Sequence, residues 1–102
     1  MDQCFHILVS GRVQGVGYRN FVLKQARENQ FQGQVRNLRD GRVEVIVRGN
    51  PQRVADFVVQ LKKGPLLSSV ENVDSKIVVL KTFSDFIIVQ DGVSPWSFEI
   101  AL

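Results

Sequence analysis

The hydrophobic pattern of this 102-residue chain switches between two periods, and this switching limits the folds open to it. Phe5, Ile7 and Val9 alternate with more polar positions, which predicts a strand with one buried face. Apolar residues then recur at helical spacing, first over 18–26 and again over 54–61. Two amphipathic helices must bury their apolar faces, and a sheet with one apolar face is the natural partner.

Four further segments are predicted to be strands. They span 33–38, 42–48, 70–80 and 86–89. The order is strand, helix, strand, strand, helix, strand, with one extended piece after it. We therefore predict an α+β, ferredoxin-like sandwich, in which two helices pack on one face of an antiparallel sheet. We place the domain at residues 1–89. Residues 90–102 are predicted to be a C-terminal extension, and one expected structure for it is an extra packed strand.

Composition excludes several classes of protein. The single cysteine, Cys4, cannot form an internal disulfide, so nothing indicates an oxidising compartment. The longest apolar runs have four residues, whereas a membrane helix needs about 20. The N-terminus lacks the charged and long apolar regions of a signal peptide. We expect a cytoplasmic monomer with no membrane partner.

Positive charge is concentrated in the first half of the chain. Residues 1–50 carry eight basic and four acidic side chains, a net charge of +4, whereas residues 51–102 carry five and six, a net charge of −1. This field suits a small anionic substrate as well as a polymer. The predicted strand over 42–48 has no aromatic residue on which a base would stack, so nucleic acid is not an expected partner.

A glycine-rich loop joins the first predicted strand to the first helix. From Gly11 to Arg19 it reads Gly-Arg-Val-Gln-Gly-Val-Gly-Tyr-Arg. The glycines at 15 and 17 let backbone N–H groups converge on an anion, and the helix N-terminus adds partial positive charge. Arg19 lies in the first helical turn, where a guanidinium is able to bind two phosphate oxygens. From the loop alone, an ordinary glycine-rich turn with a solvated Arg19 is an equally good interpretation.

Asn37 ends the second predicted strand, just before a hairpin turn at 39–41. Its side-chain amide is able to donate and to accept, so it would hold a water molecule against a bound phosphate. Taken singly, hydrogen bonding to the turn backbone is the more common role of such an asparagine. Both interpretations stay open at this point.

The sequence around these residues offers no pattern of metal ligands and no activated nucleophile. Cys4 has no arginine six residues on, the carboxylates are scattered, and His6 is expected on an open or edge face of the sheet. A reaction here would proceed without a metal, a cofactor or a covalent intermediate. Hydrolysis of an acyl phosphate fits, because a carboxylate leaves without a general acid and positioning with charge stabilisation suffices.

These segments resemble the acylphosphatase family. Residues 11–19 are similar to its signature G-x-V-Q-G-V-x-[FY]-R, and residues 33–49 are similar to a second signature that contains Asn37. The resemblance covers about residues 4–89 and implies a ferredoxin-like enzyme that converts an acyl phosphate and water into a carboxylate and phosphate. It implies that Arg19 binds the phosphate and that Asn37 orients the attacking water. The residues whose backbone would cradle the phosphate are Gln14, Gly15, Val16, Gly17 and Tyr18.

The chain departs from the family pattern at two places. Gln34 stands where an aromatic residue is usual, and the closing Phe-x-Ile of the family has two candidates, at 86–88 and 98–100. Spacing favours the first, in which case removal of residues 90–102 is expected to leave a folded and active enzyme. The alternative function is a non-catalytic module that binds phosphate or carbamoyl phosphate.

Overall fold

The computed structural model describes residues 1–97, which form two helices packed against one five-stranded sheet. The elements in chain order are β1 (Gln3–Arg12), α1 (Tyr18–Glu28), β2 (Gln32–Asn37), β3 (Val43–Gly49), α2 (Pro51–Lys63), β4 (Ser69–Val78) and β5 (Phe86–Ile88). Within the described residues, no helix is both long and apolar enough to span a membrane.

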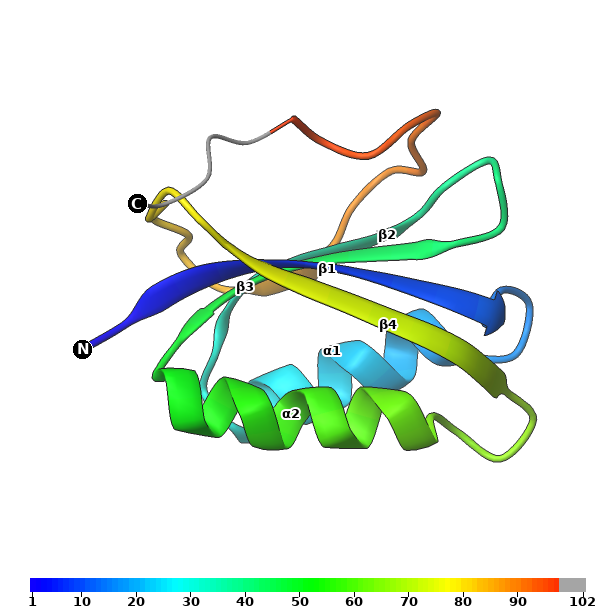
Figure 1. Cartoon of the computed structure of the whole chain (residues 1–102), viewed down its shortest axis with the longest axis horizontal. Coiled ribbons are helices and arrows are strands. Elements are labelled where there is room, and N and C mark those ends of the chain that lie inside the picture. Colours follow the sequence, from blue (N-terminus) through cyan, green and yellow to red (C-terminus); the bar gives the residue numbers. More distant parts are fainter. Residues whose placement is uncertain (98–102) are drawn as a thin grey trace.

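The strand order across the sheet is β4-β1-β3-β2-β5. β1 pairs antiparallel with β3 and β4, and β2 pairs antiparallel with β3, whereas β5 joins β2 in parallel. Both helices lie on one side of this sheet (Figure 1). The predicted ferredoxin-like fold is confirmed. The sheet is mixed rather than wholly antiparallel, because the chain crosses from β4 at one edge to β5 at the other.

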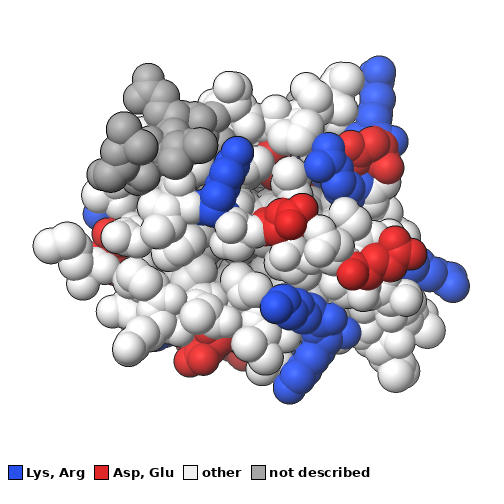
Figure 2. All heavy atoms as spheres, in the orientation of Figure 1, with Lys and Arg blue, Asp and Glu red and all other residues white. Residues whose placement is uncertain are grey.

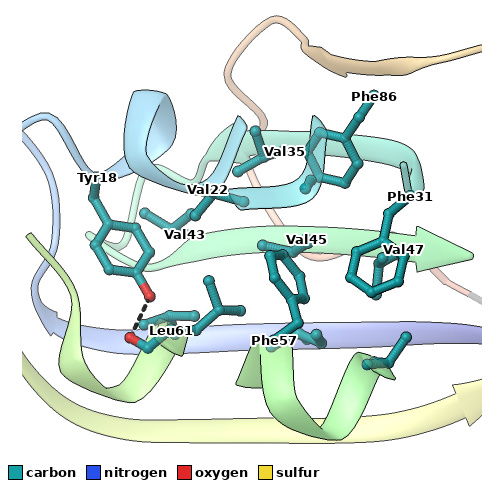
Figure 3. Close-up of a cluster of buried hydrophobic side chains, with 14 of the residues drawn as sticks. Tyr18, Val22, Phe31, Val35, Val43, Val45, Val47, Phe57, Leu61 and Phe86 are labelled. Atoms are coloured by element: carbon teal, nitrogen blue, oxygen red, sulfur yellow. Dashed lines mark hydrogen bonds between the residues drawn. The ribbon is translucent and has the colours of Figure 1, made fainter. Parts of the chain in front are cut away.

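The main core lies between the helices and the sheet (Figure 3). The buried helical residues fall three or four positions apart, as the periodicity predicted: Tyr18, Val22 and Ala26 in α1, and Val54, Phe57 and Leu61 in α2. Alternate residues of β2 and β3 meet them from the sheet, among them Val35, Val43, Val45 and Val47. Full burial of such a side chain contributes about 1.5–3 kcal/mol, so the helical faces hold both helices on the sheet.

Tyr18 fixes the start of α1 on the second helix. Its hydroxyl donates to the backbone oxygen of Leu61, with 2.8 Å between the two oxygens (Figure 3). Burial raises the pKa of the Tyr18 phenol well above its usual value, so the hydroxyl stays a neutral donor. The glycine-rich loop immediately before Tyr18 is thereby held in a fixed place on the fold.

The other face of the sheet is partly covered by the chain that follows β5 (Figure 1). His6 and Glu44 lie on this face, because their neighbours along β1 and β3 point into the main core. His6 was expected on an open or edge face, but its exposed fraction is 3% and its Nε2 lies 2.6 Å from a carboxylate oxygen of Glu44. Gln34 falls on this face as well, and the second candidate closing motif, Phe98 to Ile100, lies outside the described residues.

Candidate active site

A pocket of about 290 Å³ opens at the N-terminus of α1, between the glycine-rich loop and the ends of β2 and β5. Its walls are formed by Val13, Gln14, Gly15, Gly17, Tyr18, Arg19, Asn20, Asn37 and Ile88. The residues that the sequence singled out in two separate motifs therefore meet in one place. Val16 is the exception among them, since it is partly buried and packs against the main core.

The loop owes its shape to two glycines in the left-handed region. Gly15 has φ 71° and Gly17 has φ 77°, and Gly17 is the N-cap residue of α1. A side chain at either position would be strained by the backbone, although the space around both is open. The first N–H groups of a helix have no partner within the helix, so they remain available to an anion in the pocket.

Arg19 brings a formal positive charge to the pocket. It lies in the first turn of α1, and its side chain is 39% exposed. Its Nη1 lies 3.4 Å from a carboxylate oxygen of Asp91, whose side chain is 63% exposed. An ion pair exposed to this degree contributes only about 0–1 kcal/mol, so an incoming phosphate dianion is able to compete for the guanidinium.

Asn37 contributes a polar group of another kind. Asn37 is the last residue of β2, and its side chain lies on the helix side of the sheet. The residue is 9% exposed. Its Oδ1 is buried and has no hydrogen-bond partner among residues 1–97. Leaving such an oxygen unpaired costs about 1–3 kcal/mol, so a ligand or a water molecule that donates to it would be favoured.

Gln14 acts through its side chain as well as its backbone. The Nε2 amide donates to the backbone oxygens of Leu38 and Arg42, at 2.7 and 2.8 Å. These two oxygens belong to the ends of the β2–β3 hairpin, so Gln14 ties the glycine-rich loop to the strand that carries Asn37. The sequence indicated the backbone role alone, because these acceptors are identified only when the fold brings loop and hairpin together.

We expect Gln14→Glu to lower the free energy of unfolding and to weaken phosphate binding in the pocket. The isosteric carboxylate cannot donate to Leu38 and Arg42, so each lost hydrogen bond should cost about 0.5–1.5 kcal/mol. Urea unfolding followed by circular dichroism would measure this loss, and titration with inorganic phosphate would show weaker binding. Gln52→Glu, an exposed position in the first turn of α2, is the matched control. Unchanged stability in Gln14→Glu would contradict the role of the side chain.

Three residues of the pocket wall, Val13, Asn20 and Ile88, were not among the predicted site residues. Val13 lies within the glycine-rich loop and belongs to the main core. Asn20 directly follows Arg19 in α1, and this neighbouring position was the only signal in the sequence that Asn20 would line the pocket. Ile88 comes from β5, and it reaches the pocket because β5 lies in parallel beside β2. No sequence pattern indicated that neighbour relation.

The charged groups near the pocket indicate a small anion as ligand. Among residues 1–97, no three His, Cys, Asp or Glu side chains gather in a way that would hold a metal ion. On the face of the molecule drawn in Figure 2, Lys and Arg side chains are interleaved with Asp and Glu and form no continuous basic surface. The lining of the pocket brings together a loop of backbone N–H groups, one guanidinium and one amide, which are groups able to donate hydrogen bonds to phosphate oxygens.

Comparison with known proteins gives a consistent result. The family model for acylphosphatase matches residues 5–88. An acylphosphatase of Chlorobaculum tepidum is 46% identical over 77 residues, which cover 76% of this chain and 84% of that protein. The solved structure of an acylphosphatase from Coxiella burnetii has a TM-score of 0.83 at 38% identity, covering 86% of this chain and 93% of its own.

A larger protein contains a similar unit. The structure of full-length HypF in its phosphate- and nucleotide-bound form matches 90% of this chain with a TM-score of 0.84 at 31% identity. The match covers only 12% of HypF.

Proposed function

The chain belongs to the acylphosphatase family, and we propose that it hydrolyses acyl phosphates at the pocket formed by Arg19, Asn37 and the Gln14–Tyr18 loop. The products are a carboxylate and inorganic phosphate. The observation that carries the assignment of the site is the buried Oδ1 of Asn37, which lacks a partner within residues 1–97 and lines the same pocket as the loop.

The phosphate group binds between the loop and Arg19. Backbone N–H groups of the loop and of the first turn of α1 donate to its oxygens, and the guanidinium donates two parallel hydrogen bonds. The backbone donors are held before the substrate arrives, because the Tyr18 hydroxyl bonds to α2 and the Gln14 amide bonds to the hairpin. They stabilise the charge that spreads over the phosphoryl oxygens in the transition state.

Asn37 positions the water that attacks phosphorus. The side-chain oxygen accepts a hydrogen bond from this water. A lone pair of the water oxygen is then directed at the phosphorus. A bond forms from the water oxygen to phosphorus as the bond from phosphorus to the acyl oxygen breaks. An acyl phosphate dianion and water thereby give a carboxylate and dihydrogen phosphate, and both water protons end on the phosphate. The carboxylate is a weak base, so it needs no proton as it leaves.

Turnover of benzoyl phosphate in a metal-free buffer tests the proposal. We expect hydrolysis that is unchanged by EDTA, because charge stabilisation comes from Arg19 and the loop. Inorganic phosphate should inhibit competitively, since it presents the same anion to the same donors. Loss of activity in EDTA with recovery on adding magnesium would contradict this mechanism, and non-competitive inhibition would place the anion elsewhere.

The second candidate is a module that binds phosphate or carbamoyl phosphate without turning it over. The likeness to one part of HypF favours it, because that structure holds a unit of this fold within a much longer chain. Calorimetric titration with both anions separates the two candidates. Binding without release of phosphate from any acyl phosphate would favour the module, whereas turnover would favour the enzyme.

A further inference from the structure

We propose that residues 90–97, here called the C-terminal strap, position Asn37 for the reaction and that Glu44 anchors the strap from the opposite face of the sheet. The inference rests on the proposed function of Asn37. The strap follows β5 and runs over the face of the sheet that the helices leave uncovered (Figure 1). By this proposal, the C-terminal strap contributes to catalysis.

The first attachment of the strap is at the backbone of Asn37. The N–H of Gly92 donates to the Asn37 backbone oxygen at 3.0 Å, and the Gly92 oxygen accepts from the N–H of Arg39 at 3.0 Å. Gly92 thereby forms an isolated parallel bridge with Leu38, beyond the end of β5. One strap residue therefore holds the peptide groups on both sides of Leu38, at the point where β2 ends and its hairpin turn begins.

The second attachment is at Glu44. The backbone N–H of Trp96 donates to a Glu44 carboxylate oxygen at 2.8 Å, and His6 Nε2 lies 2.6 Å from the same oxygen. The other carboxylate oxygen accepts from Arg36 Nε at 2.8 Å. Burial opposes ionisation of Glu44, but the hydrogen bonds from His6, Arg36 and Trp96 together lower its pKa. Glu44 therefore remains a charged acceptor that holds strap and sheet together.

Arg36 connects the two attachments. Its Nη2 donates to the Ser94 oxygen at 3.0 Å, and its guanidinium carbon lies 3.5 Å from the centre of the Trp96 ring. A methyl group on Gly92 would come within 2.3 Å of Arg36 Nη1, so the strap lies directly on this side chain. Arg36 immediately precedes Asn37 in β2, and the two side chains point to opposite faces. The strap thus packs behind the residue that faces the pocket.

This arrangement matters because no partner within residues 1–97 holds the Asn37 Oδ1. Its orientation depends on the backbone that carries it, and β2 ends at this residue. A displacement of about 1 Å in a positioning group is able to lower a rate by up to about 10²-fold. The strap supplies backbone support where the regular pairing of the sheet stops.

Two variants and two truncations test the inference. Trp96→Pro removes both the N–H that donates to Glu44 and the ring that packs on Arg36. Val93→Ala, at a strap residue that is 64% exposed, is its matched control. A chain that ends at Asp91 loses the strap beyond that residue but keeps the partner of Arg19, and a chain that ends at Ser97 keeps the whole strap. We expect kcat for benzoyl phosphate to fall about 10-fold in Trp96→Pro and in the shorter chain, with KM little changed. The two controls should keep the kcat of the full chain.

Each variant is then combined with Asn37→Ala. If the strap acts through Asn37, its loss should lower kcat no further in that background. A thermal melt that drops while kcat holds would reduce the strap to a structural role, and a raised KM would mean that it acts on phosphate binding. Should the shorter chain not fold, Trp96→Pro in the full chain decides. If Asn37→Ala itself leaves kcat unchanged, the proposed role of Asn37 fails instead.

Discussion

Arg19→Lys is expected to lower kcat/KM for benzoyl phosphate by about 10²–10³-fold. The substitution keeps the positive charge of the pocket but loses the planar pair of donors that a guanidinium offers to two phosphoryl oxygens. Lysine presents a single point charge at the end of a flexible stem, so the donors are no longer fixed where charge develops. Steady-state kinetics with purified variants would measure the loss.

The fold should tolerate this substitution. Arg19 is partly exposed, and its ion pair with Asp91 is too weak to stabilise the domain appreciably. Arg27→Lys, in the same helix and paired with the exposed Asp85, is the matched control and should keep near-normal turnover. Near-normal turnover in a folded Arg19→Lys variant would remove Arg19 from the site.

Asn37→Ala is expected to lower kcat by about 10²-fold while KM changes little, the pattern of an interaction made mainly in the transition state. The structure adds an expectation for stability. Because the Oδ1 accepts no hydrogen bond from the described residues, its removal breaks no hydrogen bond that holds the fold. The melting temperature should therefore hold while activity falls, as differential scanning calorimetry would show.

Asn37→Asp separates the possible roles of the amide. The carboxylate still accepts a hydrogen bond from water but loses the NH₂ donors and brings negative charge toward the phosphate. It should be no more active than Asn37→Ala and should bind phosphate more weakly. A raised KM with kcat intact in Asn37→Ala would make Asn37 a substrate ligand. A lower melting temperature alone would mean that it braces the hairpin turn.

The fold was predictable because its signals are local. The alternation at Phe5, Ile7 and Val9 and the helical stripes identify β1, α1 and α2, and their order leaves few ways to bury three apolar faces. The pairing of β5 with β2 was not predictable, because no local signal chooses between the two edges of a sheet. Ile88 was missed as a wall of the pocket for the same reason.

The candidate site, too, was predictable only where its residues carry local sequence patterns. The glycine-rich loop, Arg19 and Asn37 carry sequence patterns, and the fold places them around one pocket. The Gln14 side-chain bonds and the anchor at Glu44 depend on contacts between distant segments. Alternation in β3 showed only that Glu44 lies away from the main core. It did not indicate that a later segment would cover that carboxylate. The expectation that residues 90–102 are dispensable stays a prediction, and the proposed strap predicts the opposite result for residues 92–97.

The place of β1 in the sheet has a consequence for how the chain folds. β1 precedes its two partners in the sequence: it pairs with β3 on one side and with β4 on the other, and β4 follows it at a distance of more than half of the 102 residues. Both ladders close large loops, whose entropy must be lost before the contacts are made, so folding is slower than in a helical bundle of equal length. Until β4 emerges from the ribosome, one edge of β1 stays open to strands of other nascent chains. An open strand edge is able to pair with another chain, so we expect incomplete copies that lack β4 to aggregate more readily than the complete domain.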